Sequence, residues 1–241
     1  MARRCYAEDP INSSAVTITG GEAHHLLHVL RAAPGMRVTL FDGTGYEFEA
    51  EVTNCGRSSV DLAVQDRQEV DRELPLPLTL GVPLPKGDRQ RWIVEKAVEL
   101  GVSRFVPLVT ERSKAAGEKH AGDKLARYVI EASKQCGRNR LMEIAEPHDW
   151  PGWLRLPAMS SGEPRRIWVA HPAGRPLLGG DLAPGHSTYV AVGPEGGLTD
   201  PETAAAQAAG WELIGLGPRL MRIETAAIAL VASLTVHTTA T

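Results

Sequence analysis

Two glycine-rich segments late in the chain contain residue types that could bind a ligand and act on it. The first is Gly193-Pro-Glu-Gly-Gly197, which follows an apolar run and precedes a helix start. Its glycines would let backbone amides approach a ligand without interference from Cβ atoms. A turn that only requires positive φ explains one glycine, but less naturally three glycines and a carboxylate. We interpret the segment as a ligand-binding loop in which Glu195 could orient an amide, a hydroxyl group or a base.

The second segment, residues 216–226, reads LGPRLMRIETA. A Gly-Pro turn leads through Arg219 and Arg222 to Glu224 and Thr225, at the expected first turn of a helix. The last two residues could simply cap exposed helix amides. Two arginines beside a glycine-rich turn nevertheless favour an anionic partner, or one that becomes anionic during a reaction.

Motifs of several other enzyme classes are absent from the sequence. It contains no GxGxxG, no GxxxxGK[ST], no HExxH and no GxSxG. Its three cysteines are widely spaced, which favours neither a disulfide framework nor a zinc site. His24 and His28 could share an ion at helical spacing, but no further ligand accompanies them. We therefore predict no metal.

The elements that must position the two segments belong to an alternating α/β pattern. The expected strands are residues 78–82, 105–109, 167–170, 188–192 and 211–216, and the expected helices are 89–100, 123–135, 199–210 and 223–236. Two of these strands run into predicted loops at residues 170–172 and 193–197. Because ligands in open α/β sheets bind beyond the carboxyl ends of strands, we expect the site there.

The front of the chain has a different pattern. Residues 37–41, 46–52 and 59–64 alternate apolar and polar side chains, which predicts a small sheet or barrel. A short helix with an apolar stripe precedes them; the stripe consists of Ala23, Leu26, Leu27 and Leu30. The prolines within residues 73–77 disfavour both helix and central strand. We therefore expect two domains, 1–73 and 74–241.

Charge is distributed unevenly along the chain. The formal net charge of -3 gives no global sign of a polyanionic partner. Residues 1–73 have an acidic excess, whereas residues 86–140 are basic and include Arg127, Lys134 and Arg138 at near-helical spacing. This strip could follow a phosphate backbone, or it could be a solvated helix face with pairs such as Arg127 and Glu131. With no signal-like start and no apolar run of membrane length, we expect a cytoplasmic protein without membrane partners.

Six segments, taken in order, resemble the RsmE family of 16S rRNA uridine-N3 methyltransferases, within the SPOUT superfamily. These segments are His24-His-Leu-Leu-His-Val-Leu-Arg31, Phe41-Asp-Gly-Thr-Gly45, Glu95-Lys-Ala-Val-Glu-Leu-Gly101, Glu131-Ala-Ser-Lys-Gln-Cys-Gly-Arg138, Val192-Gly-Pro-Glu-Gly-Gly197 and residues 216–226. The resemblance implies a PUA-like N-terminal β-barrel domain for RNA and a C-terminal SPOUT-type α/β domain with a deep trefoil knot. It also implies a homodimer that uses S-adenosyl-L-methionine (SAM) and acts on 16S rRNA within the small ribosomal subunit.

The resemblance assigns expected roles to individual residues. Arg138 or Arg222 would stabilise a uridine anion, and Glu195 or Glu224 would act as base or as orienting group; the sequence leaves both choices open. The expected SAM-binding residues are Ala170, His171, Pro172, Gly193, Pro194, Glu195, Gly196, Gly197, Leu216, Gly217, Leu220, Met221, Arg222 and Thr225. The expected RNA-binding residues are His24, His28, Arg31, Lys86, Arg112, Arg127, Lys134 and Arg138.

Three other functions stay open from the sequence. A ribose 2′-O methyltransferase of the same superfamily could act on tRNA or other rRNA. A non-catalytic RNA-binding relative would keep the basic strip and lose SAM binding. A Rossmann-type nucleotide enzyme would explain the alternation of strands and helices, but it predicts an early GxGxxG that is missing.

Overall fold

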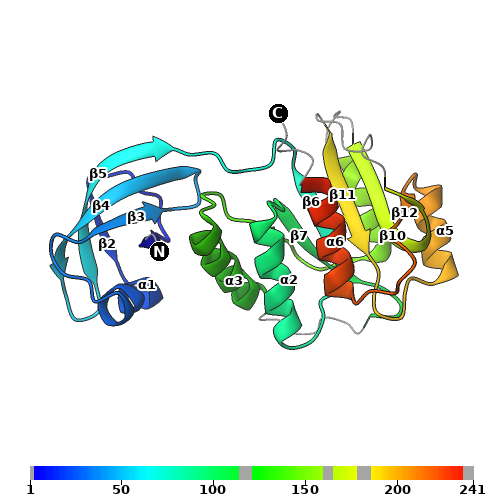
Figure 1. Ribbon diagram of the computed structural model, residues 1–241, viewed down its shortest axis with the longest axis horizontal. Coiled ribbons are helices and arrows are strands. Elements are labelled where there is room, and N and C mark those ends of the chain that lie inside the picture. The colour runs from blue at the N-terminus through cyan, green and yellow to red at the C-terminus, as the bar shows by residue number, and fades with distance from the viewer. Residues whose placement is uncertain (1–2, 114–120, 160–164, 178–185, 236–241) are drawn as a thin grey trace. The chain divides into compact units, whose positions relative to one another are not determined.

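The structure is a computed structural model that describes residues 3–113, 121–159, 165–177 and 186–235 (Figure 1). Its contacts divide the chain into two compact units. The front unit consists of residues 1–73 and 133–141, and the back unit of residues 74–132 and 142–241. The first division therefore falls between Glu73 and Leu74. The assignment of residues 133–141 to the front unit was not predicted.

The front unit is built on a five-stranded sheet. Its elements are β1 (Arg4–Tyr6), β2 (Ala15–Ile18), α1 (Gly20–His24), the π-helix η1 (His25–Val29), β3 (Arg37–Phe41), β4 (Tyr46–Cys55) and β5 (Val60–Glu69). The strand order is β1-β3-β4-β5-β2, and only β1 and β3 pair in parallel. Within the described residues β1 and β2 are edges, so the pairing gives an open sheet, one of the two forms that alternation predicted, rather than the β-barrel that the resemblance implied. β1 and β2 are short, which explains why alternation did not reveal them.

The predicted helix near residue 25 exists, but its second half is wider than an α-helix. Ala23 and Leu26 are buried in the core of the sheet, and Leu27 and Leu30 pack partly against it, as the apolar stripe predicted. The helix ends at Val29 with Leu30 as its C-cap, and the next residue, Arg31, has a φ of 53° in the left-handed region that normally favours glycine. A π-turn at this point cannot be predicted from a period of 3.6 residues.

Residues 133–141 are held in the front unit by a network of arginines. Arg72 Nη1 donates to Glu47 Oε1 at 2.6 Å and to the Gly137 carbonyl at 2.8 Å. Arg4 also donates to Glu47, and its Nη2 donates to Asn139 Oδ1 at 2.6 Å. Because one carboxylate orients both guanidinium groups, Glu47 organises the contacts that hold this segment.

The back unit is a parallel α/β sheet, which confirms the predicted fold class at that level. Its elements are β6 (Leu78–Val82), α2 (Asp88–Glu99), β7 (Arg104–Val109), α3 (Ala121–Cys136), β8 (Glu143–Ile144), β9 (His148–Asp149), α4 (Trp150–Arg155), the 3-10 helix η2 (Leu156–Met159), β10 (Arg165–Pro176), β11 (Ser187–Val192), α5 (Asp200–Ala208), β12 (Glu212–Gly215) and α6 (Ile223–Thr235). From Ser133 onward, α3 belongs to the front unit. The strand order is β12-β10-β11-β6-β7-β8, with β9 also paired to β7, and all of these pairs are parallel. The last residue of the predicted closing helix, 236, lies outside the described residues.

Helices cover both faces of this sheet. On one face α6 lies beside α2 and packs against β6 and β11 (Figure 1). On the other face α4 and α5 contribute to a core that includes Trp150, Trp153, Tyr189 and Trp211. All five residues of β6 are buried, as expected for a parallel strand covered on both faces. The centre of the sheet is therefore inaccessible, and ligands can reach only the ends of its strands.

One predicted loop is a strand instead. Residues 170–172 lie within β10, which continues to Pro176. Ala170 and Arg175 both pair with Ile214, so the residues between them form a bulge in the ladder with β12. A Cβ atom at Gly174 would lie only 2.4 Å from the Ile214 carbonyl carbon. The polar and proline residues after Ala170 were read as a loop because sequence alternation does not reveal such a bulge.

We expect Gly81→Ala to destabilise the back unit. A methyl group at this position in β6 would lie 2.8 Å from Trp153 Cζ2 and 3.0 Å from Leu108 Cδ1. Since Trp153 is fully buried, overpacking should cost about 1–3 kcal/mol in the free energy of unfolding, measured by urea denaturation. Gly122→Ala on α3 is the matched control, because a Cβ there meets nothing within 4 Å. Equal stability of the two variants would contradict this packing.

We expect Glu47→Gln to reduce the stability of the front unit and its dependence on acid. Burial opposes ionisation of Glu47, but hydrogen bonds and charges from Arg72 and Arg4 hold the pKa of its carboxyl below the ordinary value of 4.5. The stabilisation is therefore complete above that pH and is lost as the pH falls through the lowered pKa. At neutral pH the substitution should cost about 1–2 kcal/mol in the free energy of unfolding.

Thermal unfolding between about pH 7 and pH 3 tests this expectation. Glu49→Gln is the control, because Glu49 is exposed on the same strand. If the Glu47→Gln variant and the parent lost stability in parallel over the whole range, the role given to this carboxylate would be wrong.

Candidate functional site

The loops that follow neighbouring strands open at one edge of the back sheet. β12, β10, β11, β6 and β7 are successive parallel neighbours. The residues after β11 and β12 are the two glycine-rich segments, and those after β6 and β7 lead to α2 and to the turn at residues 110–113. The carboxyl ends of parallel strands share an edge, so segments far apart in sequence meet there (Figure 1).

The loop at residues 193–197 combines an open backbone with firm anchors. Gly197 has φ +72°, and a Cβ there would meet nothing within 4 Å. Its amide donates to the Pro194 carbonyl at 2.8 Å, which closes a tight turn. A capping box follows at the start of the predicted helix: Thr199 N donates to Glu202 Oε2 at 2.8 Å, and the Thr199 hydroxyl caps the first turn of α5. The glycine backbone of this loop is therefore not covered by side chains at Gly197, and the loop is fixed where α5 begins.

Arg89 joins this loop to the start of α6. It lies in the first turn of α2, and its Nη1 donates to Glu195 Oε1 at 2.6 Å. The same nitrogen lies 3.8 Å from Glu224 Oε2. The hydrogen bond that Arg89 donates to Glu195, together with the charges of both carboxylates, raises the pKa of Arg89 above its ordinary value, although partial desolvation opposes this. One cation thus serves two carboxylates from different loops.

The two carboxylates differ sharply in exposure. The Glu195 side chain is 58% exposed and that of Glu224 only 10%. Within the described residues, Glu224 Oε2 is buried and has no hydrogen-bond partner. A buried oxygen without a donor is costly, and the nearby helix N-terminus compensates only part of that cost. Glu224 therefore suits a ligand that brings its own donors or a positive charge.

The turn after β7 supports the same loop from the other side. Arg112 Nη1 donates to the Gly196 carbonyl at 2.8 Å. The Glu111 amide donates to Glu202 Oε1 at 2.8 Å, and Glu202 is also the capping residue of α5. Arg112, which we expected to contact RNA, thus has a structural contact with the loop.

The segment after β12 exposes two arginine side chains. Gly217 has φ +99° and open space where a Cβ would lie. Arg219 and Arg222 are exposed, and no ion pair to either is found within the described residues. Leu220 is 92% exposed. α6 begins directly afterwards, with Ala226 N donating to the Arg222 carbonyl at 2.9 Å. These arginines remain available to an anionic partner.

The predicted SAM-binding residues are distributed over three places at this edge. Leu216 and Met221 are half-buried beside the arginines, and Thr225 is exposed. Pro194 is buried under its loop. Ala170, His171 and Pro172 lie at the start of the bulge in β10. The role of these residues in SAM binding stays a prediction.

The front unit contains Lys134 and Arg138 of the predicted basic strip, whereas Arg127 lies in the back unit. Arg138 is buried, and its guanidinium donates from both Nε and Nη2 to Glu73. Lys134 Nζ donates to Glu22 Oε1 at 2.7 Å. Arg127, in contrast, is exposed. The predicted basic strip is therefore not continuous, because two of its three side chains are buried against carboxylates.

The remaining predicted RNA-binding residues are accessible. His24 and His28 stack with ring centroids 4.5 Å apart, and both are exposed, as are Arg31 and Lys86. The role of these residues in RNA binding stays a prediction.

Arg89 is the site residue that sequence reasoning missed. Arg219 and Arg222 lie inside a glycine-rich segment, where the sequence pattern indicates them, whereas Arg89 follows β6 and a single glycine, Gly87. The rule that ligands bind at the carboxyl ends of strands could have identified it, because β6 and β11 are neighbours.

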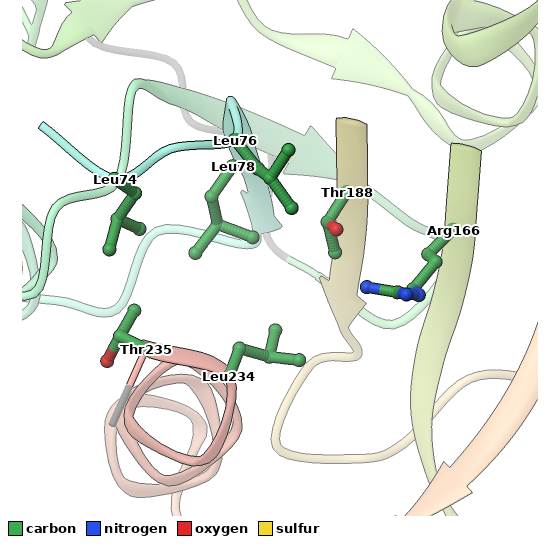
Figure 2. A pocket seen from close by; sticks show the side chains of 7 residues that line it. All are labelled: Leu74, Leu76, Leu78, Arg166, Thr188, Leu234 and Thr235. Carbon is green, nitrogen blue, oxygen red and sulfur yellow. The ribbon is translucent and has the colours of Figure 1, made fainter. Parts of the chain in front are cut away.

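A pocket also exists at the opposite ends of the strands (Figure 2). It lies at the amino ends of β6, β10 and β11 and beside the end of α6. The residues that line it are Leu74, Leu76, Leu78, Arg166, Thr188, Leu234 and Thr235. Apart from Arg166 and the two threonines these side chains are aliphatic, and none comes from the glycine-rich segments. The chemistry described above does not use this pocket.

Two further observations concern metals and membranes. In the part of the chain that the structure describes, no group of three or more His, Cys, Asp or Glu side chains is arranged to hold a metal ion. Among the same residues, no helix combines the length and apolar character needed to cross a bilayer.

Comparison with known proteins identifies relatives of nearly the whole chain. A model of the RNA methyltransferase domain matches residues 72–235, and a model of the RNA methyltransferase PUA domain matches residues 18–65. A ribosomal RNA small subunit methyltransferase E from Synechocystis is 31% identical over 93% of this chain and 74% of its own length, and that from Bacillus subtilis is 29% identical over 92% and 90%. The crystal structure of a ribosomal RNA small subunit methyltransferase E from Neisseria gonorrhoeae bound to S-adenosyl methionine is 30% identical, with a TM-score of 0.87 over 98% of both chains. Both the site and these relatives lead to one conclusion: the chain belongs to the RsmE family of RNA methyltransferases.

Proposed function

We propose that this protein transfers a methyl group from SAM to N3 of a uridine in 16S rRNA of the small ribosomal subunit. One observation carries the proposal: the loops after β11 and β12 meet at one sheet edge, where they place the buried carboxylate of Glu224 near open glycine backbone and exposed arginines. The relatives that match nearly the whole chain are named ribosomal RNA small subunit methyltransferase E, which supports a methyltransferase of small-subunit rRNA.

The residues at this edge fit SAM. Gly197 and Gly217 leave backbone unobstructed by side chains. Glu224 offers a buried acceptor that a ribose hydroxyl or an ammonium group would satisfy. Together with residues 170–172 and 193–197, these groups would hold the cofactor, which supplies an electrophilic methyl group. No metal is needed for that chemistry.

The protein's own groups would make the uridine reactive. N3 of uridine is a poor nucleophile until its proton leaves, so the site must favour the anion. Arg222 is exposed on the loop beside Glu224, where it would stabilise that anion electrostatically. Glu195 or Glu224 would accept the proton or orient the base. We keep Arg138 as a second candidate for anion or phosphate contact, although its guanidinium would first have to leave Glu73.

Recognition of RNA would involve the front unit. Its match to a PUA domain and the exposed group His24, His28 and Arg31 support this assignment. Lys86, Arg112 and Arg127 would add cations from the back unit. A base in structured RNA must also be extruded before N3 is accessible, at a cost that these contacts would offset.

We also propose the SPOUT-type trefoil knot, assembly as a homodimer and a cytoplasmic location. The approach of Gly174 to Ile214 and Gly215, too close for a side chain, supports a tightly threaded path at this point of the back unit. Homodimer and location rest on the family resemblance alone.

Incubation of the protein with labelled SAM and undermethylated small subunits tests the reaction. We expect label in RNA, recovered as N3-methyluridine after digestion to nucleosides. Large subunits and tRNA serve as controls. Label on a ribose, or in tRNA only, would instead indicate a 2′-O methyltransferase and overturn the proposal.

Arg222→Ala should slow methyl transfer strongly. Loss of a group that stabilises developing charge should raise the barrier by about 2–4 kcal/mol, which is a drop in kcat of roughly 10²–10³. Single-turnover rates with saturating SAM provide the measurement. Arg57→Ala is the control, because Arg57 is exposed in a turn of the front unit. A rate for Arg222→Ala within a few-fold of the parent would remove Arg222 from the mechanism.

A further inference from the structure

We propose that Arg89 is a positioning residue that fixes the loop at residues 193–197 for SAM binding and compensates the buried charge of Glu224. The inference rests on the proposed function, because it takes that loop to be part of the SAM site. Arg89 has no expected role from the sequence patterns, and it lies outside both glycine-rich segments.

The position of Arg89 follows from the order of the strands. β6 and β11 are paired neighbours, so the first turn of α2 and the loop at residues 193–197 emerge side by side. Gly87 precedes the helix with φ +65°, and Arg89 follows two residues later. A guanidinium group in the first turn of α2 can therefore reach across to the next loop.

Arg89 makes two unequal contacts there. The contact with Glu195 is a hydrogen bond of 2.6 Å between side chains that are 37% and 58% exposed. The contact with Glu224 is longer, 3.8 Å, but that carboxylate is buried. An exposed ion pair contributes little, whereas a buried charge that loses its counter-ion is costly. Arg89 should therefore matter more to Glu224 than the longer distance alone suggests.

Arg112 gives the loop a second anchor. It holds the carbonyl of Gly196, while Arg89 holds the side chain of the preceding residue. Adjacent residues of the loop are thus fixed by arginines that follow β6 and β7. With both anchors in place, the loop is ordered before a ligand arrives, which lowers the entropic cost of binding.

The same helix provides a matched control. Arg91 lies two residues after Arg89 and donates from Nε to Glu95 at 2.6 Å, with the i,i+4 spacing of an ordinary helix pair. Its guanidinium carbon lies 5.7 Å from the Tyr128 ring centroid, and among the described residues no ion pair links it to either glycine-rich segment. Arg91→Ala removes the same charge from the same helix without touching the site.

The test is calorimetric SAM binding to the full-length protein. Arg89→Ala should raise the Kd for SAM about tenfold, because Glu224 loses its cation. Glu195→Ala should raise it about threefold or less, because only an exposed pair is lost. Arg89→Lys should recover most of the affinity, since the charge is kept. The double variant Arg89→Ala, Glu195→Ala should bind no more weakly than Arg89→Ala alone, and Arg91→Ala should match the parent.

Several results would overturn the inference. These are a Kd for Arg89→Ala within twofold of the parent, additive losses in the double variant, an Arg89→Lys variant as weak as Arg89→Ala, or an equal loss in Arg91→Ala. Methyl-transfer rates at saturating SAM add a control: kcat of Arg91→Ala should stay within about threefold of the parent, because Arg91 pairs with Glu95 on its own helix. If the parent bound SAM yet modified no RNA, the proposed function would fail while the binding test still judged Arg89.

Discussion

A parallel sheet covered on both faces leaves only the two ends of its strands for chemistry, and the site depends on this constraint. β6 is buried along its whole length, and β11 is buried except at its first residue. Every connection that leaves the carboxyl ends emerges at the same edge. Residues that are more than a hundred positions apart, such as Arg89 and Glu195, therefore become neighbours without any local sequence signal.

Within the front unit, hydrogen bonds and ion pairs of arginines hold the segment at residues 133–141 in place. Arg4 and Arg72 share Glu47 and reach residues 137–139, and Arg138 is buried against Glu73. Buried cations are tolerated only with partners of this kind. Pairing with carboxylates also engages Lys134 and Arg138, two of the three cations of the predicted RNA-binding strip. Position in a basic run thus says little about which cations are available to a phosphate.

Buried strands and helix caps were predictable from the sequence, whereas departures from regular helices and strands were not. The capping box at Thr199 and Glu202 and the buried strands β6 and β11 follow from spacing and composition alone. The π-turn before Arg31 and the bulge after Ala170 do not, because each inserts residues without changing the local composition. The role of Arg89 was hidden for another reason: the order of strands in the sheet, which no sequence pattern gives, makes β6 the neighbour of β11.

Charges at the sheet edge fall into two groups. Arg89 and Arg112 are engaged by acceptors of the loop at residues 193–197, whereas Arg219 and Arg222 have no ion pair within the described residues. The first pair uses its donors to order the protein, so it has fewer left for a polyanion. The second pair lies on a glycine-rich turn beside an exposed Leu220 and keeps its donors. Under the proposed function, such a division would let the first pair order the loop for SAM while the second pair stays free for the RNA. Under the proposed function, the acidic excess of residues 1–73 is compatible with an RNA substrate, because the cations proposed to act on the uridine anion include Arg222 of the back unit.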